Sequence, residues 1–235
     1  MTAAALTYAI ADLHGRLDLL ELAYDAISAD SAGRPATIVH LGDYVDRGPQ
    51  SRGVLEWLME DPALPPWIRR ICLRGNHEDI MLACARDAGL AGRWWMPNGG
   101  GATLLSYGAR IGDSIASAVV HVPAEHLAWL AALPRLHVDR HRVFVHAGVD
   151  PARPLDRQDD ERMGWMLYPD GCEDGHGQRH IVHGHHQHAQ GPLLFSGRTN
   201  LDTFAWMTGR LVVGVFDDAL AGGPIRTLEV KGAPA

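Results

Sequence analysis

One local pattern occurs three times in the first 90 residues: a short apolar run, a polar turn and a segment with helical spacing. The apolar runs cover residues 6–11, 36–41 and 68–73, and the helical segments begin near Leu17, at Ser51 and after Glu78. Ser51 has the side chain of a helix N-cap. Strands that alternate with helices in this way form right-handed βαβ units around a mostly parallel sheet. The pattern therefore predicts an α/β fold.

The second half of the chain is richer in strand patterns. A short helix is expected from Ala124 to the residue before Pro134. Strands are then expected at 142–145, 180–182, 193–195, 199–201, 211–216 and 225–230, the last two as a hairpin. The Pro-Asn-Gly-Gly-Gly run at 97–101 is expected to form a loop. Because no repeat, low-complexity segment or linker interrupts the sequence, we expect one domain with two sheets over residues 1–235.

The composition narrows the class of protein. Of the 235 residues 46% are apolar and 21% charged, which is typical of a globular domain. The formal charge of −7 argues against broad nucleic-acid binding, which needs a basic face. No apolar run approaches the roughly 20 residues of a membrane span. Three cysteines without a C-x-x-C pair are typical of free thiols in a reducing compartment. We therefore expect a cytoplasmic protein that does not bind membranes.

Side chains that can bind metal ions follow five of the expected strands. They are Asp12 and His14, Asp43 and Asp46, Asn76 and His77, His146, and His183 and His185. Taken singly, an Asp after a strand can be a helix cap, a Gly-Asn-His sequence a turn, and clustered histidines a surface feature. Because ligands bind outside the carboxyl ends of strands in α/β proteins, the series instead indicates a shared site. A set without Cys suits Mn²⁺, Fe or Zn²⁺, and its size suits a pair of ions about 3.5–4 Å apart.

These strand ends resemble a known series of motifs. The motifs are DLHG at 12–15, GDYVDRG at 42–48, GNHE at 75–78, HAG at 146–148 and GH at 184–185. They are similar, in type and order, to those of the calcineurin-like metallophosphoesterases, and most of all to the bacterial branch of the serine/threonine phosphoprotein phosphatases. The resemblance implies an α/β/β/α fold, with two mixed sheets sandwiched between helices and the active site at the C-terminal strand ends. It also implies two divalent metal ions, with manganese expected first and iron or zinc as alternatives.

The resemblance assigns the metal ligands position by position. The first ion would be held by Asp12, His14 and Asp43, and the second by Asp43, Asn76, His146 and His185. A carboxylate such as Asp43 can bridge two cations, and a neutral Asn limits the negative charge that an incoming phosphate meets. The ions would activate a water molecule for direct attack on phosphorus, without a phosphoenzyme.

The catalytic and substrate-binding roles follow from the same resemblance. His77 would be the general acid, and Asp46 would orient its ring. Arg47 would bind phosphate oxygens in a bidentate manner. The residues expected at the substrate are Arg47, Asn76, His77, His183 and Arg198, with His183 also a candidate for supporting the metal ligands.

One departure from the family pattern concerns the substrate phosphate. The related phosphatases carry an Arg where this chain has Leu167, unless the loop is shifted by the alignment. Loss of that cation weakens the case for dianionic monoesters and leaves room for a diester, an anhydride or a cation from elsewhere, such as Arg198. Residues 94–96, Trp-Trp-Met, could line a substrate groove or pack in the core.

The leading functional hypothesis is hydrolysis of phosphate monoesters in phosphorylated proteins or small molecules. The alternative is a symmetrical dinucleoside polyphosphate hydrolase or a phosphodiesterase. A catalytically silent scaffold is a remote third possibility, because the ligand series is complete.

Overall fold

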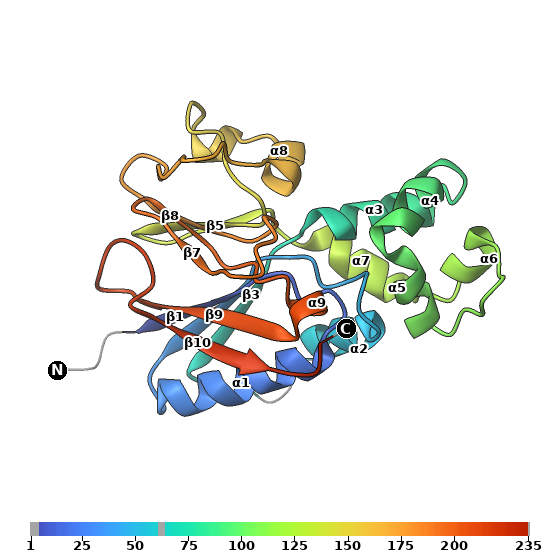
Figure 1. Ribbon diagram of the computed structural model, residues 1–235, viewed down its shortest axis with the longest axis horizontal. Helices are drawn as coiled ribbons and strands as arrows, with labels where there is room; N and C mark the ends of the chain where they lie inside the picture. Colours follow the sequence, from blue (N-terminus) through green and yellow to red (C-terminus); the bar gives the residue numbers. More distant parts are fainter. Residues whose placement is uncertain (1–4, 61–63, 235) are drawn as a thin grey trace.

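The computed structural model describes residues 5–60 and 64–234, and its first sheet contains the N-terminal strands (Figure 1). The strand order is β10-β9-β1-β2-β3. The strands are β1 (Leu6–Ile10), β2 (Ala36–His40), β3 (Ile68–Cys72), β9 (Arg210–Asp217) and β10 (Arg226–Lys231). As expected from the repeated pattern, β1, β2 and β3 are parallel. The two C-terminal strands form an antiparallel hairpin beside β1, so the sheet is mixed.

The second sheet is also mixed and has the order β4-β5-β6-β8-β7. Its strands are β4 (Leu136–Val138), β5 (Arg142–Val145), β6 (His180–His183), β7 (Leu193–Leu194) and β8 (Arg198–Asn200). Strands β5, β6 and β8 run parallel, and β4 and β7 are antiparallel edge strands. Strand β4 was not expected from the sequence.

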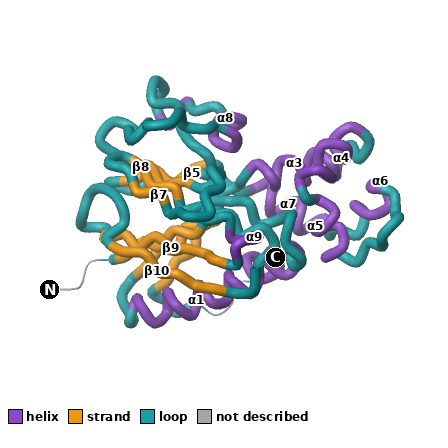
Figure 2. The backbone as a smooth tube through the Cα atoms, in the orientation of Figure 1, coloured by secondary structure: helices purple, strands orange, loops and turns teal. Residues whose placement is uncertain are grey.

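The two sheets pack face to face, and helices cover their outer sides (Figures 1 and 2). Alternate residues of β1 show the layering: Ala9 belongs to the core between the sheets with Phe144 and Phe216, whereas Tyr8 faces the other way. The outer side of the first sheet is covered by α1 (Leu17–Ser31) and α2 (Ser51–Met59). The short α8 (Asp160–Trp165) lies over the second sheet. The α/β/β/α fold with two mixed sheets is thereby confirmed.

A cluster of helices lies to one side of the sheets. It contains α3 (Asn76–Arg86), α4 (Leu90–Trp95), a 3₁₀ helix η1 (Met96–Asn98), α5 (Gly100–Ser106), α6 (Ile115–Val119) and α7 (Ala124–Ala132). The remaining short helical elements are η2 (Leu155–Arg157) and α9 (Ala205–Thr208). No helix within residues 5–60 and 64–234 combines the length and the apolar content that crossing a membrane requires.

Two local expectations were wrong. The expected loop at 97–101 is instead the end of η1 and the start of α5, separated by Gly99 at φ +100°. Its glycines serve close packing: a Cβ on Gly100 would lie 2.5 Å from the ring of Trp95. Ser51 does not cap α2, because it is the first helical residue and its hydroxyl accepts a hydrogen bond from the backbone N–H of Asp46. In both places tertiary contacts outweigh local propensity.

Candidate active site

The strand-end turns carry an unusual backbone conformation. Eight non-glycine residues among those described have positive φ, and six of them are expected site residues: Asp12, His14, Asp43, Asp46, Arg47 and His185. Their φ angles lie between 43° and 74°, in the left-handed region. Non-glycine residues rarely adopt this backbone conformation, which costs of order 1–3 kcal/mol per residue. It is maintained only where the surrounding contacts enforce it. The concentration of strain at these turns marks a built site.

Glycines allow the turns to approach one another closely. A Cβ on Gly42 would lie 2.5 Å from the backbone nitrogen of Gly75, and Gly42 also has φ +102°. A Cβ on Gly75 would lie 2.6 Å from the backbone nitrogen of Asp43. The turns after β2 and β3 are therefore in direct backbone contact, which brings the Asp43 and Asn76 side chains together.

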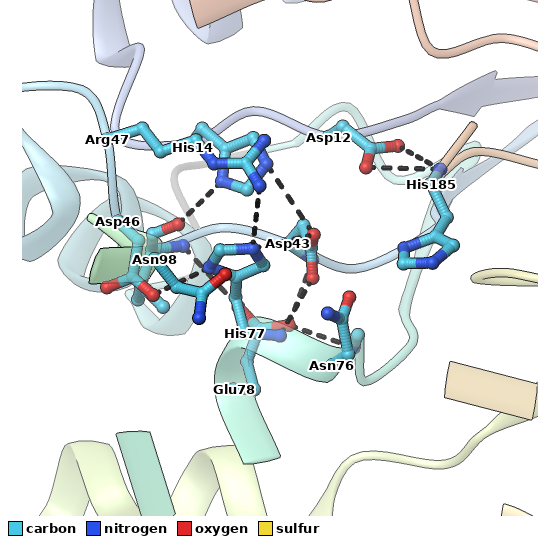
Figure 3. Close-up of polar contacts among 12 residues, drawn as sticks. Asp12, His14, Asp43, Asp46, Arg47, Asn76, His77, Glu78, Asn98 and His185 are labelled. Atoms are coloured by element: carbon cyan, nitrogen blue, oxygen red, sulfur yellow. Dashed lines mark hydrogen bonds and ion pairs between the residues drawn. The ribbon is translucent and has the colours of Figure 1, made fainter. Parts of the chain in front are cut away.

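Asp43 lies at the centre of the site (Figure 3). Its Oδ2 is 3.5 Å from Nε2 of His14, and its Oδ1 is 3.4 Å from Nε2 of His146. All three side chains are buried. Two groups of donor atoms could hold a metal ion, namely His14, Asp43 and His77, and Asp43, His146 and His185. Asp43 belongs to both groups, as expected of a carboxylate that bridges two cations.

The histidines at this centre have the tautomer that metal binding needs. Nδ1 of His14 donates to the carbonyl of Val45 at 2.8 Å, and Nδ1 of His146 donates to the carbonyl of Leu41 at 3.0 Å. Nε2 of His14 is buried and has no hydrogen-bond partner among the described residues. Each Nε2 therefore carries a lone pair directed into the site, and the Nδ1–H contacts fix the ring orientation.

Burial keeps these imidazoles neutral. It lowers the pKa of His14 well below the usual range and also lowers the pKa of His146. Burial, followed by the neighbouring His146, lowers the pKa of His185 to about 3. Only a neutral imidazole can bind a metal ion, so at neutral pH these three histidines do not have to lose a proton first.

The remaining expected ligands, Asp12 and Asn76, also face the centre. The Asp12 carboxylate accepts the backbone N–H of His185 at 3.0 and 3.2 Å, and Oδ1 of Asn76 is 2.8 Å from Nε2 of His146. Burial, with the charges of Asp202 and Asp43, raises the pKa of Asp12 well above its usual range. A divalent cation would stabilise the ionised form of these buried, closely spaced carboxylates. The residues present therefore fit a pair of metal ions.

His77 replaces Asp12 in the first of the two donor groups, but its ring nitrogens already have partners. Nδ1 of His77 donates to Oδ2 of Asp46 at 2.7 Å, and Nε2 lies 3.1 Å from an Arg47 guanidinium nitrogen. Burial lowers the pKa of His77, but the carboxylates of Asp43 and Asp46 outweigh it and the net pKa is raised. A histidine with a raised pKa and a fixed Nδ1–H suits proton donation better than metal binding.

Glu78 is a site residue that sequence reasoning missed. Its buried carboxylate accepts the backbone N–H groups of Asp43 at 2.9 Å, Tyr44 at 2.8 Å and Gly75 at 2.8 Å (Figure 3). Burial raises the pKa of Glu78 to about 8. The side chain holds the two central turns together. A Glu three residues after the position that precedes a helix is a capping-box signal, which would have indicated part of this role.

An open cavity of about 480 Å³ lies over the centre. It is lined by Asp12, Asp43, Arg47, Asn76, His77, Asn98, Trp165, Leu167, Tyr168, Asp170, His185, His186 and Gln187. Leu167 is 65% exposed and does face the site, so the position expected to carry an Arg holds an apolar side chain. Arg47 is the one Arg or Lys among these lining residues.

The structure does not place His183 or Arg198 at the cavity. Arg198 donates to the carbonyl of Cys172 at 2.7 Å, and another of its nitrogens lies 3.0 Å from Nε2 of His183. Its guanidinium lies over the rings of Phe195 and Tyr168. The guanidinium of Arg198 is engaged by these contacts. The structure therefore does not support the expectation that Arg198 supplies the missing phosphate-binding cation.

Comparison with known proteins identifies the family. The sequence model of the calcineurin-like phosphoesterases matches residues 6–214. The chain belongs to this family. It is thus a member of the phosphoric ester hydrolases, as the motif series implied.

Relatives of similar sequence include proteins named as symmetrical bis(5'-nucleosyl)-tetraphosphatases. The protein of Pseudomonas fluorescens strain SBW25 is 29% identical over 62% of this chain and 44% of its own length. That of Pseudomonas putida strain W619 is 28% identical over 70% of this chain and 53% of its own length. The chain therefore spans about half the length of these relatives.

Solved structures share the fold. A crystal structure assigned as a candidate diadenosine tetraphosphatase has a TM-score of 0.64 at 22% identity, covering 98% of this chain and 99% of its own. A serine/threonine phosphatase from Saccharomyces cerevisiae with similarity to human PP5 has a TM-score of 0.59 at 16% identity, covering 100% and 82%.

The two donor groups predict the outcome of removing a ligand from one of them. Wild-type protein reconstituted with Mn²⁺ and desalted should retain about two ions per chain, and His146→Ala about one. Elemental analysis by mass spectrometry measures the number of Mn²⁺ ions per chain. His188→Ala is the control, because His188 is exposed and nearby, and it should retain the wild-type content. Retention of about two ions by His146→Ala would contradict the assignment.

Proposed function

We propose that this chain is a dinuclear metal-dependent phosphoesterase. The observation that carries the proposal is that the two oxygens of Asp43 point towards two different donor groups. The first ion would be held by Asp12, His14 and Asp43, and the second by Asp43, Asn76, His146 and His185. When bound, the ions would polarise the phosphoryl oxygens and lower the pKa of a coordinated water. The oxygen donors and neutral imidazoles suit manganese, iron or zinc.

His77 supplies the proton for the leaving group. Its Nδ1–H is held by Asp46, which leaves Nε2 directed at the cavity beside Arg47. In the protonated ring, Nε2–H donates its proton to the leaving oxygen as the bond to phosphorus breaks. Asp46 stabilises the imidazolium before this transfer. After it, Asp46 holds the neutral ring in the tautomer that carries the proton on Nδ1.

Arg47 binds the phosphoryl oxygens. One of its guanidinium nitrogens is buried without a hydrogen-bond partner among the described residues, while the other lies beside His77. A forked donor next to the general acid can hold the reacting phosphate between the acid and the metal centre. The left-handed backbone of Arg47, at φ +68°, directs the side chain over the cavity.

Among the possible substrates, we favour dinucleoside polyphosphates over phosphomonoesters. Leu167 leaves Arg47 as the single Arg or Lys among the residues that line the cavity, which suits phosphates that carry one charge each better than a dianionic monoester. A second hollow of about 370 Å³, with Trp206 in its wall, shares Arg47 with the cavity over the candidate metal centre. Space on both sides of Arg47 suits a phosphate chain with a nucleoside at each end. The symmetrical tetraphosphatases among the relatives support the same choice.

The general-acid role predicts a selective effect of His77→Ala. Phenolate is a poor leaving group that needs protonation, whereas p-nitrophenolate leaves readily without it. The kcat for phenyl phosphate should fall by roughly 10²–10⁴-fold, and that for p-nitrophenyl phosphate by much less. Equal losses on the two substrates would remove His77 from this role. Asp43→Asn is the companion variant and should lose activity on both, because it disrupts the metal centre itself.

A substrate panel tests the preferred substrate class. With Mn²⁺ added, kcat/KM should be higher for diadenosine tetraphosphate than for p-nitrophenyl phosphate, its bis ester or a phosphoserine peptide. Release of two ADP molecules per substrate would show symmetrical cleavage. A preference for the phosphopeptide would overturn the substrate assignment and favour a protein phosphatase, while leaving the metal-dependent mechanism in place.

A further inference from the structure

The carboxylate that orients the general acid is itself held by the helical cluster. Nε1–H of Trp95 donates to both oxygens of Asp46, at 2.8 and 2.9 Å, and the hydroxyl of Thr103 donates to Oδ1 at 2.7 Å. Trp95, Thr103 and Asp46 are fully buried. Trp95 ends α4 and Thr103 lies in α5, so neither donor comes from a strand-end turn.

Thr103 also contacts the backbone of Asp46. Its hydroxyl oxygen accepts the Asp46 N–H at 2.8 Å, and Oγ of Ser51 lies 3.1 Å from the same N–H. One hydroxyl therefore contacts both the main chain and the carboxylate of Asp46, which has φ +74°. A residue held in this conformation depends on its surroundings to keep its side chain in one direction.

The hydrogen bonds to the Asp46 carboxylate fix its orientation towards His77. An ionised carboxylate accepts about four hydrogen bonds, and those from Trp95, Thr103 and His77 converge on its two oxygens. Without its two neutral donors, the buried carboxylate would lack solvation and could turn away from His77. Packing alone would not require the Trp95 N–H, because an apolar ring could fill the same space against Gly100.

We propose that Trp95 and Thr103 are positioning residues for the general acid: by fixing the Asp46 carboxylate, they keep His77 directed at the leaving group. The inference rests on the proposed role of His77. It gives the α4–α5 segment a function in catalysis, and it separates the buried Trp95 from Trp94, whose side chain is 58% exposed.

A matched pair of variants at Thr103 tests the proposal. Thr103→Val keeps the shape and removes the hydroxyl, whereas Thr103→Ser keeps the hydroxyl. We expect Thr103→Val to lower kcat for phenyl phosphate by about 10–100-fold, because it weakens the roughly 10²–10⁴-fold contribution of the general acid without removing it, with a change below about threefold for p-nitrophenyl phosphate. Thr103→Ser should stay close to wild type on both substrates. Bound Mn²⁺ should be unchanged in both variants, because neither touches a metal ligand.

Trp95→Phe gives an independent test from the other helix. It removes the indole N–H and should reproduce the selective loss on phenyl phosphate, whereas Trp67→Phe, at a side chain that is 44% exposed, should leave both rates unchanged. Circular dichroism establishes which variants fold, and a folded variant at either position decides the question. Equal losses on the two substrates, wild-type rates, or a Thr103→Ser as impaired as Thr103→Val would overturn the proposal. If His77→Ala itself shows no selective loss, the proposed general acid fails, whatever these variants do.

Discussion

The rest of this site depends on the contacts of the buried Asp43 carboxylate. One oxygen faces His14 and the other faces His146, so a single side chain joins donor groups from the two sheets. His14 follows β1 in the first sheet, whereas His146 follows β5 in the second. The metal centre is therefore possible only because the two sheets pack with their strand ends at one edge. The fold and the candidate chemistry share this requirement.

The surroundings of Asp43 explain how strained turns are maintained. Glu78 binds the backbone N–H groups of Asp43, Tyr44 and Gly75 at once, and the N–H of His77 donates to Oδ1 of Asp43 at 3.1 Å. These contacts link the turns after β2 and β3 into one unit. The left-handed residues in that unit are consequently held by a network rather than by their own preference. Asp46 is held in a similar way, because the hydroxyl of Thr103 hydrogen-bonds to its backbone N–H and to its carboxylate.

Much of the site could be predicted from sequence, because it follows from the ends of strands. Parallel strands place their carboxyl ends at one edge, so Asp12, Asp43 and Asn76 were expected to meet. The residues that hold them were not predictable in this way. Trp95 and Thr103 reach Asp46 from helices about 50 positions further along the chain, at separations of 49 and 57 residues, and no local pattern records such a contact. Residues 97–101 and Ser51 were wrongly assigned for the same reason. The contacts of Arg198 with the carbonyl of Cys172 and with His183 were also not predictable, because charge alone does not show what a side chain binds.

In the proposed centre, Asp43 would bridge two metal ions. Anomalous diffraction from crystals soaked with Mn²⁺ tests it most directly. Two anomalous peaks about 3.5–4 Å apart are expected, with one Asp43 oxygen directed at each, the first near His14 and the second near His146. A single peak, or a pair of peaks with Asp43 in contact with only one of them, would contradict it.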